Sequence, residues 1–187
     1  MTQRLLLTVL AAFALSAPAM AAKVSGVDVP ESAEVAGTKL VLNGAGLRKK
    51  FGFAKVYVGA LYLPAKSGDA DAILSANAPA RIALHMLRDV ERDKLVAAFD
   101  EGFKANNAPD AIKALQSRFG QFLALFGDVK EGDVIALDFV PGTGTQVSVR
   151  GQVKGTVAGD DLARALMRIW LGPKPPTPEL RSGMLGK

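Results

Sequence analysis

An arginine and a tyrosine stand out in a long apolar stretch of the chain, residues 46–63. Arg48 lies near its start, and Tyr57 is one of only two tyrosines in the protein. A guanidinium pairs with a carboxylate through two parallel hydrogen bonds, and a phenol hydroxyl can add a further donor. Together they would hold the anionic head of a ligand whose apolar part lies among Phe and Leu side chains. The sequence leaves open the alternative that both side chains have a structural role. Arg48 would then form an ion pair, for instance with Asp138, and Tyr57 would only pack.

Whether these two side chains meet depends on the residues between them. They are nine positions apart, and in a straight strand an odd separation places two side chains on opposite faces. A bulge or turn at Gly52 would shift the register by one residue and bring both to the same side. The sequence therefore predicts Gly52 as the hinge on which the pair depends.

The composition excludes several other kinds of site. The chain has no Cys and a single His, His85, so thiol chemistry and a multi-histidine metal site are ruled out. No phosphate-binding P-loop, dinucleotide fingerprint, zinc-protease motif or calcium loop occurs. We therefore expect no cofactor and no metal, and we interpret His85 as a packed or hydrogen-bonded histidine of a sheet.

A basic run overlaps the same apolar stretch. Residues 48–50 and Lys55 are cationic and are interleaved with Phe51 and Phe53, a composition also found in nucleic-acid-binding patches. The net charge of +5 is modest, and it attracts anionic ligands without indicating nucleic acid. Clustered charges usually form a solvated face. We therefore predict no nucleic-acid partner.

Residues 1–21 have the layout of a secretory signal. A basic start precedes an apolar run from Leu5 to Leu15, and Ala19 and Ala21 stand at the cleavage positions. The run is shorter than the roughly 20 residues that a membrane span needs; a membrane anchor or a buried helix is the alternative. We expect residues 22–187 to form one domain that is periplasmic or secreted after signal cleavage, with no transmembrane segment.

Hydrophobic periodicity predicts an antiparallel sheet with helices on one face, an α+β fold. Alternation predicts strands over residues 23–30, 39–42, 46–63, 80–87, 133–140, 145–149 and 151–157. Helical spacing predicts helices after the N-cap Asp89, from Pro109 and from Asp160, with shorter turns over 69–75 and near 179–181. Asn43-Gly44 predicts a hairpin turn. The two tandem helices from Asp89 onward each carry an apolar stripe, which we expect to pack on the sheet.

The stretch Gly46-Leu47-Arg48-x-Lys50, followed by Lys55-Val56-Tyr57-Val58-Gly59-Ala60-Leu61-Tyr62-Leu63, resembles the chalcone isomerase superfamily, specifically its bacterial chalcone isomerase-like branch. Leu87-Arg88-Asp89-Val90, the helix over 119–126 and Trp170-Leu171-Gly172-Pro173 are similar to that family too, and the resemblance covers roughly Val24 to Gly186. It implies an open-faced β-sandwich, in which a layer of helices covers a large antiparallel sheet and a ligand cleft lies between them.

The resemblance implies two functions. Plant isomerases of the family close a chalcone phenol onto its enone, with an Arg that stabilises charge on the substrate, whereas related non-catalytic members bind fatty acids and hold the carboxylate with that Arg and a Tyr. Arg48 is similar to the family Arg, and Tyr57 falls where the isomerases carry Thr and the fatty-acid binders Tyr. The isomerases also use a Tyr and an Asn at positions held here by Glu91 and Ala98, and neither can do that job.

We therefore predict an exported binder of a fatty acid or similar amphipathic anion, with Arg48 and Tyr57 as ligands of the head group. Its partner would be a small amphipathic or aromatic molecule. One alternative is an isomerase (an intramolecular lyase) acting on a chalcone-like or other enone, in which Arg48 stabilises an enolate. Another is a scaffold in which Arg48 is structural. The sequence names no catalytic residue and leaves the ligand, the pathway and the oligomeric state open.

Overall fold

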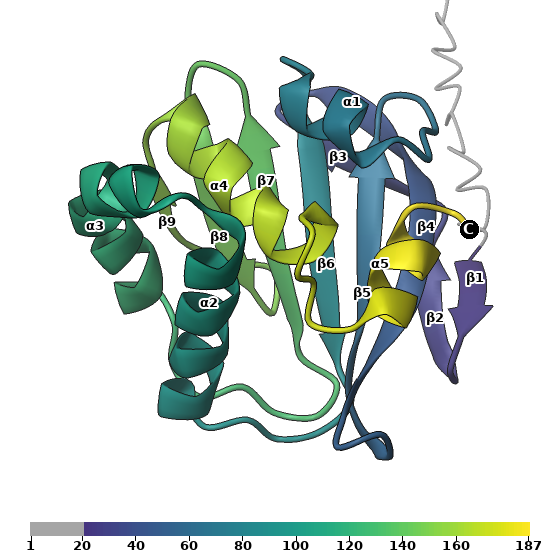
Figure 1. Cartoon of the computed structure of the whole chain (residues 1–187). Coiled ribbons are helices and arrows are strands. Elements are labelled where there is room, and N and C mark those ends of the chain that lie inside the picture. Colours follow the sequence, from purple (N-terminus) through teal and green to yellow (C-terminus); the bar gives the residue numbers. More distant parts are fainter. Residues whose placement is uncertain (1–20) are drawn as a thin grey trace, which may run out of the picture.

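The computed structural model describes residues 21–187, and a single seven-stranded sheet forms its centre (Figure 1). Each strand pairs antiparallel with the next one along the chain, so the order in the sheet is the order in the sequence. The strands are β3 (Ser32–Val35), β4 (Thr38–Lys50), β5 (Ala54–Leu63), β6 (Ala80–Met86), β7 (Val134–Val140), β8 (Gly144–Val149) and β9 (Gln152–Val157). Strands β3 and β9 are its two edges. Apart from Ala21, the expected signal lies outside the described residues.

Helices cover one face of this sheet, which confirms the predicted α+β architecture (Figure 1). They are α1 (Ala70–Ser75), α2 (Arg92–Asn106), α3 (Pro109–Ala124), α4 (Asp160–Leu171) and α5 (Pro178–Met184). Helix α4 lies on β7 and β8, and α5 lies on β4 and β5. Within residues 21–187, no helix is both long and apolar enough to cross a membrane.

The two faces of the sheet bury two separate apolar clusters. In β6, Ile82 and Leu84 point to the helices, whereas Ala83 points to the opposite face, as the two-residue repeat of a strand requires. A small hairpin of β1 (Ala21–Val24) and β2 (Val27–Pro30) packs on that opposite face. The predicted single strand over 23–30 is therefore two strands.

Asn43-Gly44 is not the predicted hairpin turn. The pair lies inside β4, at a register shift that marks a bulge. The buried Asn43 amide donates to the Met184 carbonyl over 2.8 Å, and its oxygen accepts the Ser67 N–H over 2.7 Å. A Cβ added to Gly44 would collide with the backbone of Gly183. The glycine is thus required by the close approach of α5, and tertiary contact overrides the local turn signal.

Helix α2 packs on another helix rather than mainly on the sheet. Phe99 of α2 meets Trp170 of α4 edge to face, with 6.0 Å between the ring centroids. Helix α3 packs against α2, α4 and β9. The expectation that both tandem helices pack on the sheet is therefore wrong for α2, because α4 supplies the apolar surface that it needs.

Candidate functional site

Arg48 and Tyr57 lie directly opposite each other across the β4–β5 hairpin. Opposite residues of an antiparallel pair share a face, so the structure brings the two predicted residues together. The stretch 46–63 is two strands and not one, and Gly52 lies in the turn between them with a φ of 77°. A register shift follows between Arg48 and Lys49. The predicted turn at Gly52 is thus the hairpin itself.

Tyr57 is buried under the helices with its hydroxyl held in place. The indole Nε1 of Trp170 donates a hydrogen bond of 3.0 Å to the Tyr57 oxygen. No acceptor for the Tyr57 hydroxyl hydrogen occurs among the described residues, so this hydrogen is free to be donated to a ligand. The Arg48 guanidinium carbon lies 5.4 Å from the centroid of the Tyr57 ring, within the range of a cation–π interaction.

The Tyr57 hydroxyl stays protonated in this setting. Burial raises its pKa above the ordinary value, and the opposing effects of the Arg48 charge and the Trp170 hydrogen bond are smaller. A neutral phenol beside a cation gives two donors for one anion, because neither group carries a negative charge that would repel it.

A cavity of about 320 Å³ opens beside this pair, between the sheet and helices α2 and α4. Arg48 and Tyr57 form part of its wall. The rest of the wall also carries the charged residues Glu101 and Lys174, but it is otherwise mainly apolar and includes Leu84, Leu95, Phe99, Ile169 and Trp170. The cavity therefore offers a cation and a phenol next to an apolar chamber, which is the arrangement that an amphipathic anion needs.

A second cavity of about 520 Å³ adjoins the first and is far more charged. Arg48 and Ala98 line both cavities. The other cationic side chains in its wall are Lys50, Arg88, Lys94 and Lys130, and the acidic ones are Asp89, Glu91 and Asp128. Arg48 thus lies between an apolar chamber and a charged vestibule.

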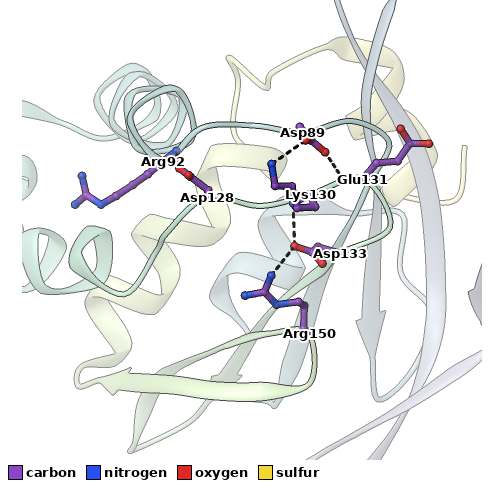
Figure 2. Close-up of polar contacts among 7 residues, drawn as sticks. All are labelled: Asp89, Arg92, Asp128, Lys130, Glu131, Asp133 and Arg150. Carbon is purple, nitrogen blue, oxygen red and sulfur yellow. Dashed lines mark hydrogen bonds and ion pairs between the residues drawn. The ribbon is translucent and has the colours of Figure 1, made fainter.

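A network of ion pairs and hydrogen bonds stabilises the wall of the vestibule (Figure 2). The Asp89 carboxylate accepts from Lys130 Nζ and from the Glu131 N–H, each over 2.9 Å. Asp133 accepts the Lys130 N–H over 2.9 Å and also pairs with Arg150. The Glu131 N–H and, to a smaller extent, Lys130 lower the pKa of Asp89. This network joins the two loops that flank the vestibule.

Asp89 is therefore not the N-cap that the sequence predicts. Helix α2 begins at Arg92, with Glu91 in the N-cap position and no side-chain hydrogen bond from it. The Asp128 carboxylate, from the other loop, accepts the Arg92 N–H over 2.8 Å (Figure 2). A residue distant in sequence thus supplies the partner that a helix N-terminus needs.

The ion pair between Arg48 and Asp138, the example given for a structural role of Arg48, does not form. Arg81, opposite Asp138 in the β6–β7 register, forms a two-pronged ion pair with it, with 2.6 Å between Nη2 and Oδ2. Asp138 is buried, and each of its two carboxylate oxygens accepts a hydrogen bond from Arg81. Among the described residues no carboxylate forms an ion pair with Arg48, so its charge is available to a ligand.

His85 lies on β6 and is half-buried. Burial lowers the pKa of its imidazole, and its buried Nε2 has no partner within residues 21–187. The histidine is thus packed rather than hydrogen-bonded through this nitrogen. No group of three His, Cys, Asp or Glu side chains in the described part of the chain could hold a metal ion.

Sequence reasoning missed Trp170 as part of the site. It is the only tryptophan of the chain and lies on an apolar helix stripe, which indicates a core residue. Its contact with Tyr57 spans 113 positions, and no local pattern encodes a contact at that distance.

A third cavity, of about 200 Å³, lies between α1, α4 and the sheet and includes neither Arg48 nor Tyr57.

The sequence model of a family described as chalcone isomerase-like matches residues 21–186. No curated protein matches the chain in sequence at a significant level. Among solved structures, the crystal structure of the Arabidopsis thaliana fatty-acid binding protein AtFAP1 matches with a TM-score of 0.67 and 20% sequence identity. The match covers 86% of this chain and 92% of that one. At this identity the likeness shows a shared fold.

Proposed function

Because the chain belongs to the chalcone isomerase-like family, we propose that it is an exported, non-catalytic binder of a fatty acid or a similar amphipathic anion. The observation that carries the proposal is the position of Arg48. Its guanidinium has no carboxylate partner among the described residues, and it borders an apolar cavity beside the donor hydroxyl of Tyr57. A partly buried cation without a partner is costly, and a bound carboxylate would neutralise it.

The proposed geometry places the ligand's carboxylate between two donors. The Arg48 guanidinium supplies parallel N–H groups and Tyr57 supplies one O–H, which Trp170 orients by its hydrogen bond. The apolar part of the ligand would then lie against Leu95 and Phe99. The similarity in fold to a structure named as a fatty-acid binding protein supports this ligand class.

The same site supports binding better than cyclisation of a chalcone. Ala98, like Arg48, lines both the apolar cavity and the vestibule. A methyl group there offers no hydrogen bond to a reacting phenol, and Glu91 pairs with Lys94 over 2.8 Å. We expect no turnover of a chalcone above its uncatalysed rate.

Export and the bacterial branch belong to the proposal as well. Export is supported by the basic start, the apolar run and the small residues before position 22. The bacterial branch is supported by the motif from Arg48 to Leu63. N-terminal sequencing of the protein recovered from the periplasm or medium tests the first point, and cleavage after Ala21 is the expected result.

Ligand analysis and titration test the binding function. We expect mass spectrometry to find copurified acyl lipid in the wild-type protein, and calorimetry to show that the delipidated protein binds dodecanoate. Arg48→Ala should weaken this binding by about one to two orders of magnitude, because a charge-assisted pair is worth about 1.5–3 kcal/mol. Lys113→Ala, on the exposed side of α3, is the matched control. Absence of bound lipid together with equal affinities of Arg48→Ala and wild type would overturn the proposal.

A further inference from the structure

The turn between β4 and β5 exposes two phenylalanines that the fold does not use. Phe51 is 78% exposed and Phe53 is 79% exposed. Within residues 21–187 the other exposed large hydrophobic residue is Val153, on β9. One exposed aromatic side chain is ordinary, but two in one three-residue turn form an apolar tip that marks an interaction site. We call residues 49–55 the hairpin tip.

The backbone of the hairpin tip makes phenylalanine an unexpected choice. Phe51 has a φ of 55° and Gly52 a φ of 77°, so both lie in the left-handed region. Asn, Asp and Gly adopt this conformation with the least strain, and hairpin turns with a positive φ prefer them. A large aromatic residue that is both strained and exposed contributes nothing evident to folding.

The charges of the hairpin tip also indicate an interaction site. Lys49 and Lys55 are direct partners across the two strands, and like charges in opposed positions destabilise a sheet. Lys50 Nζ lies 5.3 Å from the centroid of the Phe51 ring. None of these lysines forms an ion pair with a described residue. The tip therefore combines exposed aromatic rings with unneutralised cations.

We propose that the hairpin tip docks the protein on an anionic lipid surface. Phe51 and Phe53 would enter the boundary between head groups and acyl chains, and the three lysines would lie at the level of the anionic phosphates. Figure 1 shows the β4–β5 loop projecting beyond the ends of the neighbouring strands, so a flat surface can contact it. A single-stranded nucleic acid follows a groove, which a projecting turn does not provide.

Docking would also orient the vestibule. Lys50 and Phe51 of the hairpin tip line the charged vestibule that leads to Arg48. A membrane surface bound at the tip would therefore lie next to the opening of the candidate site. This arrangement does not depend on the fatty-acid proposal, since the exposed rings and the charges of the tip stand on their own.

Vesicle co-sedimentation with the mature full-length protein tests the proposal. We expect binding to vesicles that contain phosphatidylglycerol and phosphatidylcholine, and at least about tenfold weaker binding to vesicles of phosphatidylcholine alone. The double variant Phe51→Ala/Phe53→Ala should lose binding by about tenfold or more. Val153→Ala removes the other exposed hydrophobic residue and should bind as the wild type does. Thermal melting identifies any variant that is unfolded.

Two further variants separate lipid docking from a purely structural role of the tip and from nucleic-acid binding. Phe51→Gly should melt at a higher temperature, because the left-handed backbone no longer carries a Cβ, and it should still bind vesicles more weakly. Lys49→Ala/Lys50→Ala/Lys55→Ala should bind less tightly and lose most of the salt dependence. Equal binding of the phenylalanine variants and the wild type would overturn the proposal. So would tight binding of an oligonucleotide through these residues with no binding of vesicles.

Discussion

Trp170 and Tyr57 are joined by a buried hydrogen bond of 3.0 Å between indole Nε1 and the phenol oxygen. The bond links α4 to the centre of the sheet at the wall of the apolar cavity. The tyrosine oxygen accepts a hydrogen bond from the indole. Its own hydrogen must therefore point away from the indole, into the space that the indole leaves free. The same contact thus stabilises the fold and prepares a donor for the proposed ligand.

Tyr57→Phe is expected to lower both stability and ligand affinity. The change leaves the Trp170 N–H buried without an acceptor, which costs about 1–3 kcal/mol in the free energy of unfolding, and it removes one donor to the ligand. Tyr62→Phe is the matched control: the Tyr62 hydroxyl donates to the Pro30 carbonyl over 2.9 Å on the other face of the sheet. We expect urea unfolding to detect both changes, and dodecanoate titration to detect the first alone.

A double-mutant cycle with Trp170→Phe would separate the two effects of Tyr57. If the hydrogen bond orients the phenol, the two substitutions should be non-additive for dodecanoate affinity as well as for stability. Additive losses of affinity would contradict the orienting role of Trp170.

Arg81→Ala is expected to destabilise the protein without weakening the binding of dodecanoate. It would leave the buried Asp138 carboxylate unpaired, and breaking such a pair costs on the order of 3 kcal/mol in the free energy of unfolding. Arg48→Ala should show the opposite pattern, with a large loss of affinity and a small change in stability. Chemical unfolding and calorimetry on the two variants measure this contrast, and similar profiles for both would show that Arg48 is structural.

Gly44→Ala is expected to be among the most destabilising single changes in the chain. The new Cβ would collide with the backbone of Gly183 in α5, and backbone cannot move aside as a flexible side chain can. Gly120→Ala is the control, because a Cβ at this position in α3 would meet no atom within 4 Å and should add up to about 1 kcal/mol of stability. Melting temperatures that shift in opposite directions would support this expectation, whereas a harmless Gly44→Ala would contradict the close packing of α5.

The ion pair between Asp161 and Arg118 should make the protein slightly less stable in acid than at neutral pH. The Arg118 guanidinium lowers the pKa of the Asp161 carboxyl from 3.8 to about 2 in the folded protein. The folded pKa is below the unfolded one, so the ionised pair stabilises the fold above about pH 4, and this contribution disappears as the pH falls toward 2. The pair is partly exposed, so we expect less than about 1 kcal/mol.

Asp161→Asn tests this dependence. At pH 6 the variant should unfold at a slightly lower urea concentration than the wild type, and the difference should vanish by about pH 2. A difference that stays constant over this range would show that Arg118 and Asp161 contribute through packing and not through charge.

Patterns with short periods allowed much of the fold to be predicted. Alternation over residues 80–87 correctly predicted the strand β6, and its two-residue repeat places Ile82 and Leu84 on one face and Ala83 on the other. Helical spacing from Pro109 correctly indicated helix α3, whose buried residues include Phe119 and Phe122. These features depend on contacts that each strand or helix makes as a unit, so the local sequence carries the signal.

The remaining features depend on partners far away in the chain. Asn43-Gly44 has the composition of a turn, but α5 packs on it and holds it in an extended strand. Asp89 has the composition of an N-cap, yet Lys130 and Glu131 engage its carboxylate. In each case a distant group satisfies the polar atoms differently from the local rule. The residue types of the candidate site could be predicted, whereas the tryptophan that orients its phenol could not.

The order of the strands has a consequence for aggregation. Among residues 21–187, strands β3 and β9 each pair on one side only, and an unpaired edge can pair with another copy of the chain. Strand β3 is only four residues long, which limits such pairing. Strand β9 carries Lys154 and adjoins a register shift between Val147 and Ser148 of β8. A charged residue and a bulge both discourage edge-to-edge growth, so neither edge offers a long, flat template for fibril formation.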